Sequence, residues 1–194
     1  MKSLFRKRHP QETMLLFAMI GMGLAFVFLT FSYLVRKNHI DWVDFRLPKI
    51  FGFSTVFILL SSYTLYIANN AFKKEEFFTY RYFLGATLAL GVFFVISQLI
   101  GWRQLEVQGL HLRRGAVSVG FLYVISGLHI LHLFGGMGAM LFLFWQAVRK
   151  TAYVDAFVYA INPPNQRRLH LATIFWHFLG ILWLYLFVFF YVQH

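Results

Sequence analysis

The sequence contains no cysteine. This absence excludes disulfides, thiolate-ligated copper, iron–sulfur clusters and covalent attachment of haem c. Any metal held by this chain alone would therefore need histidine ligands.

Acidic residues are also scarce, because the 194 residues include only seven Asp and Glu against eighteen Lys and Arg. All seven fall in expected loops or termini: Glu12, Asp41, Asp44, Glu75, Glu76, Glu106 and Asp155. A carboxylate relay through the centre of a bilayer is therefore not available within this chain. This argues against an autonomous proton pump or proton-coupled carrier.

Long apolar runs dominate the sequence, which is 59% hydrophobic. Each run reaches the ~20 residues that a helix needs to cross ~30 Å of hydrocarbon. A soluble fold is excluded because the runs leave no polar face for water. We predict an all-α, polytopic membrane protein, a bundle of five transmembrane helices in one domain over 1–194, with spans at about 14–35, 50–72, 82–101, 116–148 and 169–192. The link before the last span should be extended at Pro163 and Pro164.

The basic residues predict the orientation of the bundle. Eleven of the eighteen Lys and Arg fall on the side of the N-terminus, which favours a cytoplasmic N-terminus and a periplasmic C-terminus. The net charge is +11, and the basic residues lie beside the ends of the expected helices. We therefore expect them to contact anionic lipid headgroups and not nucleic acid. The first run is too long for a signal-peptide core, so we expect it to be a retained helix.

Three histidines, His129, His132 and His177, lie well inside the last two runs, away from their ends. A buried neutral imidazole usually forms a hydrogen bond with a neighbouring helix. Alternatively, His129 or His132 could bind one face of a haem iron and His177 the other, or the same side chains could join in a copper site.

The order of residues in these two runs resembles subunit III of the haem-copper terminal oxidases. The fourth run reads SGLHILHLFGG from Ser126, and the fifth reads FWHFLGILWLYLF from Phe175. The penultimate helix of that family carries T-G-F-H-G-x-H-V-x-x-G and its last helix carries Y-W-H-F-V-D-x-V-W-L-F. The shared positions, which we expect to pack helices together, are Gly127, His129, His132, Gly136, Trp176, His177, Phe178 and Trp183.

The resemblance continues in the second and third runs. Ser54-Thr55 and Ser61-Ser62 match the family helix with N-T-x-x-L-L-x-S-S, and Gly91, Phe94 and Gln98 match its next helix. Five spans correspond to the short bacterial form of the family. Gln98, Trp102, Trp176 and Trp183 are candidate contacts with lipid or other subunits.

This resemblance implies an accessory subunit of a cytochrome c or quinol oxidase in the bacterial inner membrane, without a catalytic centre, haem or copper of its own. The haem and copper would belong to partner subunits, with subunit I (catalytic) and subunit II as neighbours, in a larger respiratory supercomplex where one forms. Bound phospholipid and protection of the proton-pumping core during turnover are further implications.

Four positions depart from the family pattern. Neutral or basic residues stand where the family has acidic ones, namely Met22, Gly101, His170 and Gly180. A divergent branch is therefore expected, which keeps two alternatives open. One is the accessory membrane subunit of nitric oxide reductase, and the other is an independent bis-His haem or quinone membrane oxidoreductase.

Overall fold

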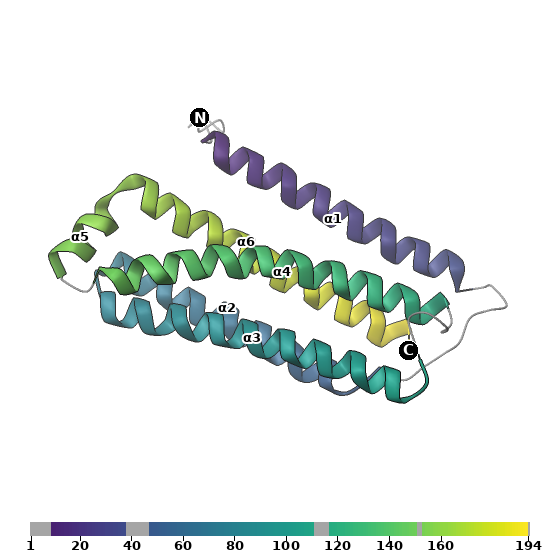
Figure 1. Cartoon of the computed structure of the whole chain (residues 1–194). Helices are drawn as coiled ribbons and strands as arrows, with labels where there is room; N and C mark the ends of the chain where they lie inside the picture. Colours follow the sequence, from purple (N-terminus) through teal and green to yellow (C-terminus); the bar gives the residue numbers. More distant parts are fainter. Residues whose placement is uncertain (1–8, 38–46, 111–116, 151–152, 194) are drawn as a thin grey trace.

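The computed structural model describes residues 9–37, 47–110, 117–150 and 153–193, except for the side chain of Asp155. Within these ranges the chain forms helices only: α1 (Pro10–Arg36), α2 (Ile50–Lys73), α3 (Phe77–Val107), α4 (Val117–Arg149), α5 (Tyr153–Ile161) and α6 (Pro163–Gln193) (Figure 1). Five of them, all but α5, are long and apolar enough to span a membrane. The predicted all-α, multi-pass membrane fold is confirmed.

α3 is longer than the predicted span of 82–101, because it begins at Phe77 and ends at Val107. Glu106, expected in a loop, is therefore in the last turn of a helix. Hydropathy locates the apolar part of a helix and not its ends, since a helix continues into the polar headgroup region. Gly109 follows the end of the helix, and its φ of 82° suits the left-handed position found after many helices.

The expectation of an extended segment at Pro163 and Pro164 is wrong, because these residues form the first turn of α6. Proline is favoured there, since the first N–H groups of a helix have no partner within it and proline loses nothing by lacking one. The backbone N–H groups of Asn165 and Gln166 both reach the carbonyl of Asn162, at 3.0 and 3.3 Å.

The nine-residue helix α5 was not predicted, and it places Asp155 in a helix instead of a loop. Its end is fixed by two side chains of α6. Asn165 Nδ2 donates to the carbonyl of Tyr159 at 3.1 Å, and Gln166 Nε2 donates to that of Ala160 at 2.8 Å. The Tyr159 hydroxyl donates to the Gln146 side chain on α4. Burial raises the pKa of this hydroxyl, and the nearby positive charge of Arg168 lowers it by less.

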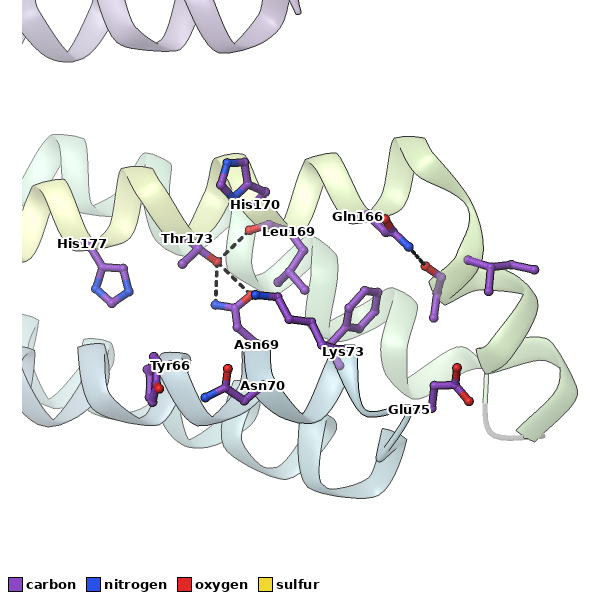
Figure 2. Close-up of a pocket in the computed structure, with 13 residues that line it drawn as sticks. Tyr66, Asn69, Asn70, Lys73, Glu75, Gln166, Leu169, His170, Thr173 and His177 are labelled. Carbon is purple, nitrogen blue, oxygen red and sulfur yellow. Dashed lines mark hydrogen bonds between the residues drawn. The ribbon is translucent and has the colours of Figure 1, made fainter. Parts of the chain in front are cut away.

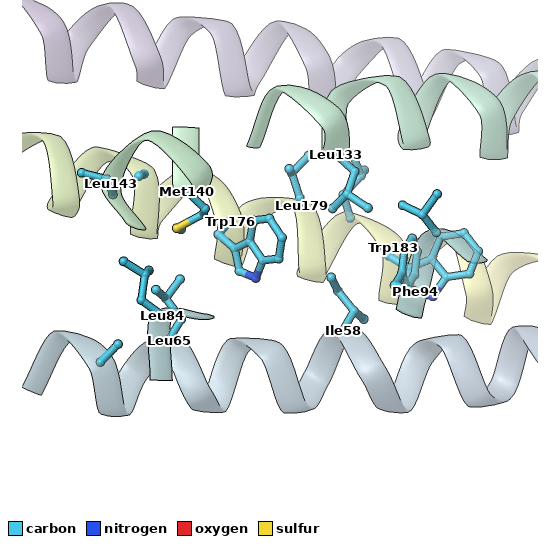
Figure 3. Close-up of a cluster of buried hydrophobic side chains, with 14 of the residues drawn as sticks. Ile58, Leu65, Leu84, Phe94, Leu133, Met140, Leu143, Trp176, Leu179 and Trp183 are labelled. Carbon is cyan, nitrogen blue, oxygen red and sulfur yellow. The ribbon is translucent and has the colours of Figure 1, made fainter. Parts of the chain in front are cut away.

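Four helices form the core of the bundle. α2 and α3 are an antiparallel pair, α4 packs on α3, and α6 lies between α4 and α2 (Figure 1). Large side chains from all four meet in the centre, as Figure 3 shows for Ile58, Leu84, Leu133 and Trp176. Apolar side chains on the outer faces suit contact with lipid.

α1 lies outside this core, against α4 and α6. Its buried side chains are Phe26, Thr30 and Tyr33, all in its C-terminal part. The Thr30 hydroxyl is 2.7 Å from that of Tyr185 on α6, and Lys37 Nζ donates to the Gln193 side chain at 2.9 Å. α1 is therefore attached mainly through the half that ends at Arg36, and its first half diverges from the bundle (Figure 1).

Candidate functional site

Trp176 on α6 joins the four helices of the core. It is fully buried, and its indole Nε1 donates to Ser61 Oγ on α2 at 3.1 Å. A Cβ atom added to Gly91 on α3 would lie 2.9 Å from the ring, and one added to Gly136 on α4 would lie 3.4 Å from it. The two glycines therefore make room for the indole between α3 and α4.

Trp183, two turns further along α6, also connects α6 with the other three helices of the core. It is 1% exposed and donates from Nε1 to Thr55 Oγ1 on α2 at 3.0 Å. Its ring meets Phe94 of α3 edge-on, with centroids 5.0 Å apart, and lies 5.4 Å from the His129 ring of α4. Aromatic contacts of this geometry add about 0.5–1.5 kcal/mol each beyond the area they bury.

Gln98 and Trp102, one turn apart on α3, extend this layer toward the end of the helix. Gln98 is fully buried and donates from Nε2 to Ser54 Oγ on α2 at 2.8 Å. Trp102 Nε1 donates to Ser126 Oγ on α4 at 3.1 Å. A Cβ on Gly127 would be 3.5 Å from the Trp102 ring, which is ordinary contact, so this glycine is not required sterically.

His129 lies in the middle of this aromatic layer without a hydrogen-bond partner. It is 0% exposed, and neither ring nitrogen has a partner among the described residues. The rings of Phe26 and Phe94 approach it edge-on, with centroids 6.3 and 5.9 Å away. His132 instead donates from Nδ1 to the Leu128 carbonyl of its own helix, at 2.7 Å. The interhelical hydrogen bonds expected of these two histidines are thus made by tryptophans.

His177 lies apart from His129 and His132, on the side of α6 that faces α2. It is half-buried and lines a cavity of about 440 Å³ between α2, α5 and α6. Figure 2 shows it pointing into the space beside Tyr66. Phe178, the next residue, is partly buried against the hydrophobic core.

The structure separates the histidines that a shared haem or copper site would need. His129 packs on the ring of Trp183, whereas His177 shares its cavity with Tyr66 and Asn69. Among the described residues there is no group of three or more His, Cys, Asp or Glu side chains that could hold a metal ion.

Close packing explains two of the four departures from the family pattern. A Cβ on Gly101 would lie 2.8 Å from the Phe51 ring, and one on Gly180 would lie 3.3 Å from Ser62 Oγ. A larger acidic residue would clash with the Phe51 ring at position 101, and at position 180 it would require the Ser62 side chain to shift by a few tenths of an ångström. Met22 packs against the core, and exposed His170 lines a cavity of about 280 Å³ between α1 and α6 opposite Glu12.

The hydrogen-bond acceptors on α2 were not among the site residues predicted from the sequence. Ser54, Thr55 and Ser61 receive the side-chain hydrogen bonds of Gln98, Trp183 and Trp176. Their signal was present in the sequence as hydroxyl pairs spaced seven residues apart in an apolar helix, because this spacing places both pairs on one face.

These features define an all-helical, multi-pass membrane protein whose core is closed by tryptophan side chains of its last helix. No protein-family model matches the chain. Cytochrome c oxidase subunit 3 of Thermostichus vulcanus is 29% identical over 193 residues, which cover 95% of this chain and 89% of that protein. Cytochrome c oxidase subunit 3 of Synechocystis sp. is 22% identical over 191 residues, or 95% of this chain and 77% of that protein.

A relative of another oxidase type is also similar. Probable quinol oxidase subunit 3 of Staphylococcus haemolyticus is 25% identical over 143 residues, which cover 74% of this chain and 66% of that protein. The relatives confirm the resemblance predicted from the sequence, and the chain fits the subunit III family of cytochrome c and quinol oxidases.

Proposed function

We propose that this chain is the accessory, non-catalytic subunit III of a haem-copper terminal oxidase in a bacterial cytoplasmic membrane. The observation that carries the proposal is the interlocked core, in which the two tryptophans of the W-H-F motif helix bond to the hydroxyl motif of α2. The two segments that meet in this contact, on α2 and α6, are segments whose sequence resembles the family. The similar proteins are themselves oxidase subunits.

The proposed role is to stabilise the catalytic core and to bind phospholipid beside it. Reduction of oxygen would take place on the haem and copper of subunit I, with subunit II as a further neighbour. In lipid, helices associate through close fit and interhelical hydrogen bonds, since hydrophobic burial gives little net drive. A rigid core of four helices offers a fixed surface for such a fit.

Co-purification tests this proposal. The tagged chain is extracted in mild detergent, its partners are identified by mass spectrometry, and the visible spectrum is recorded. We expect a large haem-copper subunit in stoichiometric amount and the spectrum of its haems. Recovery with a nitric oxide reductase would support that alternative instead, and a haem spectrum from the chain without any partner would contradict an accessory role.

A variant of His177 tests whether this imidazole has a structural role. His177→Leu should leave the oxidase spectrum unchanged while weakening retention of this chain or speeding inactivation during turnover. Ile181→Leu, at a side chain that is 67% exposed on the same helix, is the matched control and should change neither. Loss of a haem signal with normal retention would mean that His177 binds the haem.

A further inference from the structure

The cavity between α2, α5 and α6 extends from one end of the bundle toward its middle. Figure 2 shows Glu75 and Gln166 at one end of it and Tyr66 with His177 at the other. The end lined by Glu75 and Gln166, which we call the mouth, is exposed and lies on the side of the membrane that the basic residues predict to be cytoplasmic. From Pro163, the first residue of α6, to His177 the helix rises by ~21 Å at ~1.5 Å per residue. The cavity therefore leads from water into the apolar depth of the bundle.

Polar side chains line this cavity along its length. Asn69 and Thr173 form a hydrogen-bonded pair between α2 and α6, with Asn69 Nδ2 donating to Thr173 Oγ1 at 2.9 Å. The side chains of Asn70 and His177 form no hydrogen bond with any described residue. Polar groups that lack a protein partner away from bulk solvent need water, because leaving them unpaired is costly. The cavity volume of about 440 Å³ has room for roughly a dozen waters at ~30 Å³ each.

Beyond His177 the cavity ends, because α6 and α2 pack directly on each other. A Cβ atom on Gly180 would lie 3.3 Å from Ser62 Oγ, and Trp183 Nε1 donates to Thr55 Oγ1 at 3.0 Å about one turn further on. Neither Gly180 nor any later described residue of α6 lines the cavity. Among the described residues, the cavity thus has a polar mouth at one end of the bundle and a closed inner end at His177.

Lipid also borders the inner end, since Tyr66 is 58% exposed in a membrane-spanning helix. Acyl chains are therefore the other candidate to fill the space. They cannot form hydrogen bonds, so they would leave Asn70 and His177 unpaired, whereas water would satisfy both side chains. The polar lining therefore favours water.

The titratable groups around His177 come from α2 and α6. Tyr66 lies beside it on α2, whereas Figure 2 shows Lys73 nearer the mouth and the Glu75 carboxylate at the mouth itself, far from the imidazole ring. His170 lines the cavity from the same helix as His177, and the lining residues of α5 are apolar, namely Ala160 and Ile161. Among the described lining residues, no ion pair therefore holds the imidazole in its charged form, and it can gain and release a proton.

We propose that this cavity is a water-filled inlet and that His177 is a proton-binding site at its inner end. A hydronium ion at the mouth passes its proton along the waters to a ring nitrogen of neutral His177. The ring becomes an imidazolium, the hydronium becomes water, and release of the proton is the reverse step. Protonation of the site follows the pH on the side of the mouth alone, as suits an ionisable residue that reaches one aqueous phase from within a membrane. This inference goes beyond the accessory role proposed above and does not depend on it.

The absence of cysteine makes the water in the inlet measurable. Single cysteines replace Thr173 and His177 in the intact complex in membrane vesicles, and a charged, membrane-impermeant methanethiosulfonate is added on one side at a time. This reagent reacts with the thiolate, which forms in water and is suppressed in lipid. We expect Thr173→Cys and His177→Cys to be labelled from the side of the mouth only.

Tyr82→Cys is a control at the same depth as Thr173→Cys. The hydroxyls of Thr64 on α2 and Thr87 on α3 lie 2.9 Å apart, which puts these two residues at one level of the antiparallel pair. Tyr82 comes five residues before Thr87, and Asn69 comes five residues after Thr64. Tyr82 is therefore level with Asn69 and with its hydrogen-bond partner Thr173.

This control residue is exposed but faces away from the inlet. Tyr82 is 66% exposed and does not line the cavity. Its cysteine should react at least about tenfold more slowly than that at Thr173, because lipid opposes ionisation of the thiol. Equal labelling of Tyr82→Cys and Thr173→Cys, or no labelling of Thr173→Cys, would overturn the water-filled inlet.

Carbethoxylation tests proton binding, because diethyl pyrocarbonate modifies the neutral imidazole and not the imidazolium. The intact complex is treated at pH values between about 5 and 8, set separately on the two sides of the vesicles, and modified histidines are identified by mass spectrometry. We expect the rate at His177 to fall severalfold as the pH on the side of the mouth is lowered. His129, which is 0% exposed, should stay unmodified. No modification of His177, or a rate that is independent of pH or follows the other side, would contradict the proton site.

A pair of amide variants tests whether the proton arrives through this cavity. Asn70→Leu removes a polar group from the lining and should slow the modification of His177 severalfold, since an apolar wall disfavours water. Gln104→Leu makes the same change at an exposed residue of α3 that does not line the cavity, and it should leave the rate unchanged. Equal effects of the two variants, or no effect of Asn70→Leu, would mean that the proton reaches His177 by another route.

Discussion

Trp183 of α6 donates a hydrogen bond from its indole Nε1 to Oγ1 of Thr55 on α2, at 3.0 Å. Thr55 in turn donates to the Phe51 carbonyl of its own helix at 2.9 Å. The hydroxyl therefore stays hydrogen-bonded if the indole is lost, which makes this contact suitable for measuring what one interhelical hydrogen bond contributes in the bundle.

The variant Trp183→Phe keeps an aromatic ring and removes the N–H donor. We expect the free energy of unfolding in detergent to fall by about 1 kcal/mol from the lost hydrogen bond, and further from the smaller ring. Trp183→Ala should cost about 3–5 kcal/mol, because it also leaves a cavity. Trp145→Phe is the control, since Trp145 is 49% exposed, and should have little effect. Equal losses for Trp183→Phe and the control would show that the indole bond contributes nothing.

Gly91 and Gly120 allow a matched test of close packing. A Cβ at Gly91 would meet the Trp176 ring at 2.9 Å, whereas one at Gly120 would have no atom within 4 Å. Gly91→Ala should therefore destabilise the protein by about 1–3 kcal/mol through overpacking. Gly120→Ala should be neutral or stabilising by up to about 1 kcal/mol, because alanine favours the helix. Thermal unfolding of both variants decides the point, and a stable Gly91→Ala protein would show that the tryptophan can move aside.

His129 should be replaceable by an apolar residue. Its ring nitrogens have no partner among the described residues, and leaving a buried polar group unpaired costs about 1–3 kcal/mol. His129→Leu should therefore leave the free energy of unfolding unchanged or raise it. Ser126→Ala, which removes the acceptor of the Trp102 indole, should lower it by about 1 kcal/mol. A clear loss of stability in His129→Leu would mean that the ring contacts with Phe26, Phe94 and Trp183 outweigh the cost of the unpaired nitrogens.

Much of the fold followed from the sequence, because a lipid solvent requires long apolar helices. The expected span of 116–148 differs from α4, Val117–Arg149, by a single residue at each end. α5 was missed because nine residues with apolar side chains on its exposed face, such as Val154 and Val158, are too short for a spanning run. Proline was misinterpreted at Pro163, since the same residue favours loops and first turns of helices.

The candidate site was found in part. The motif marked Trp176, Trp183 and His129 as positions that pack helices together, but it did not indicate which side chain would form each hydrogen bond. That depends on the rotation of each helix about its axis, which hydropathy does not fix when all faces are apolar. The same limit applies to His177, whose place beside the cavity depends on the position of α2 relative to α6.

The orientation of the bundle remains a prediction from the basic residues, and the absence of cysteine allows a direct test of it. Lys74 and Gln108 follow the last residues of α2 and α3, two antiparallel helices, and both are exposed. Single cysteines at these positions should therefore lie on opposite sides of the membrane. With the N-terminus in the cytoplasm, a membrane-impermeant maleimide added to spheroplasts should label Gln108→Cys directly and Lys74→Cys only after permeabilisation. The unaltered chain should stay unlabelled in both conditions, and the reverse pattern of labelling would invert the topology.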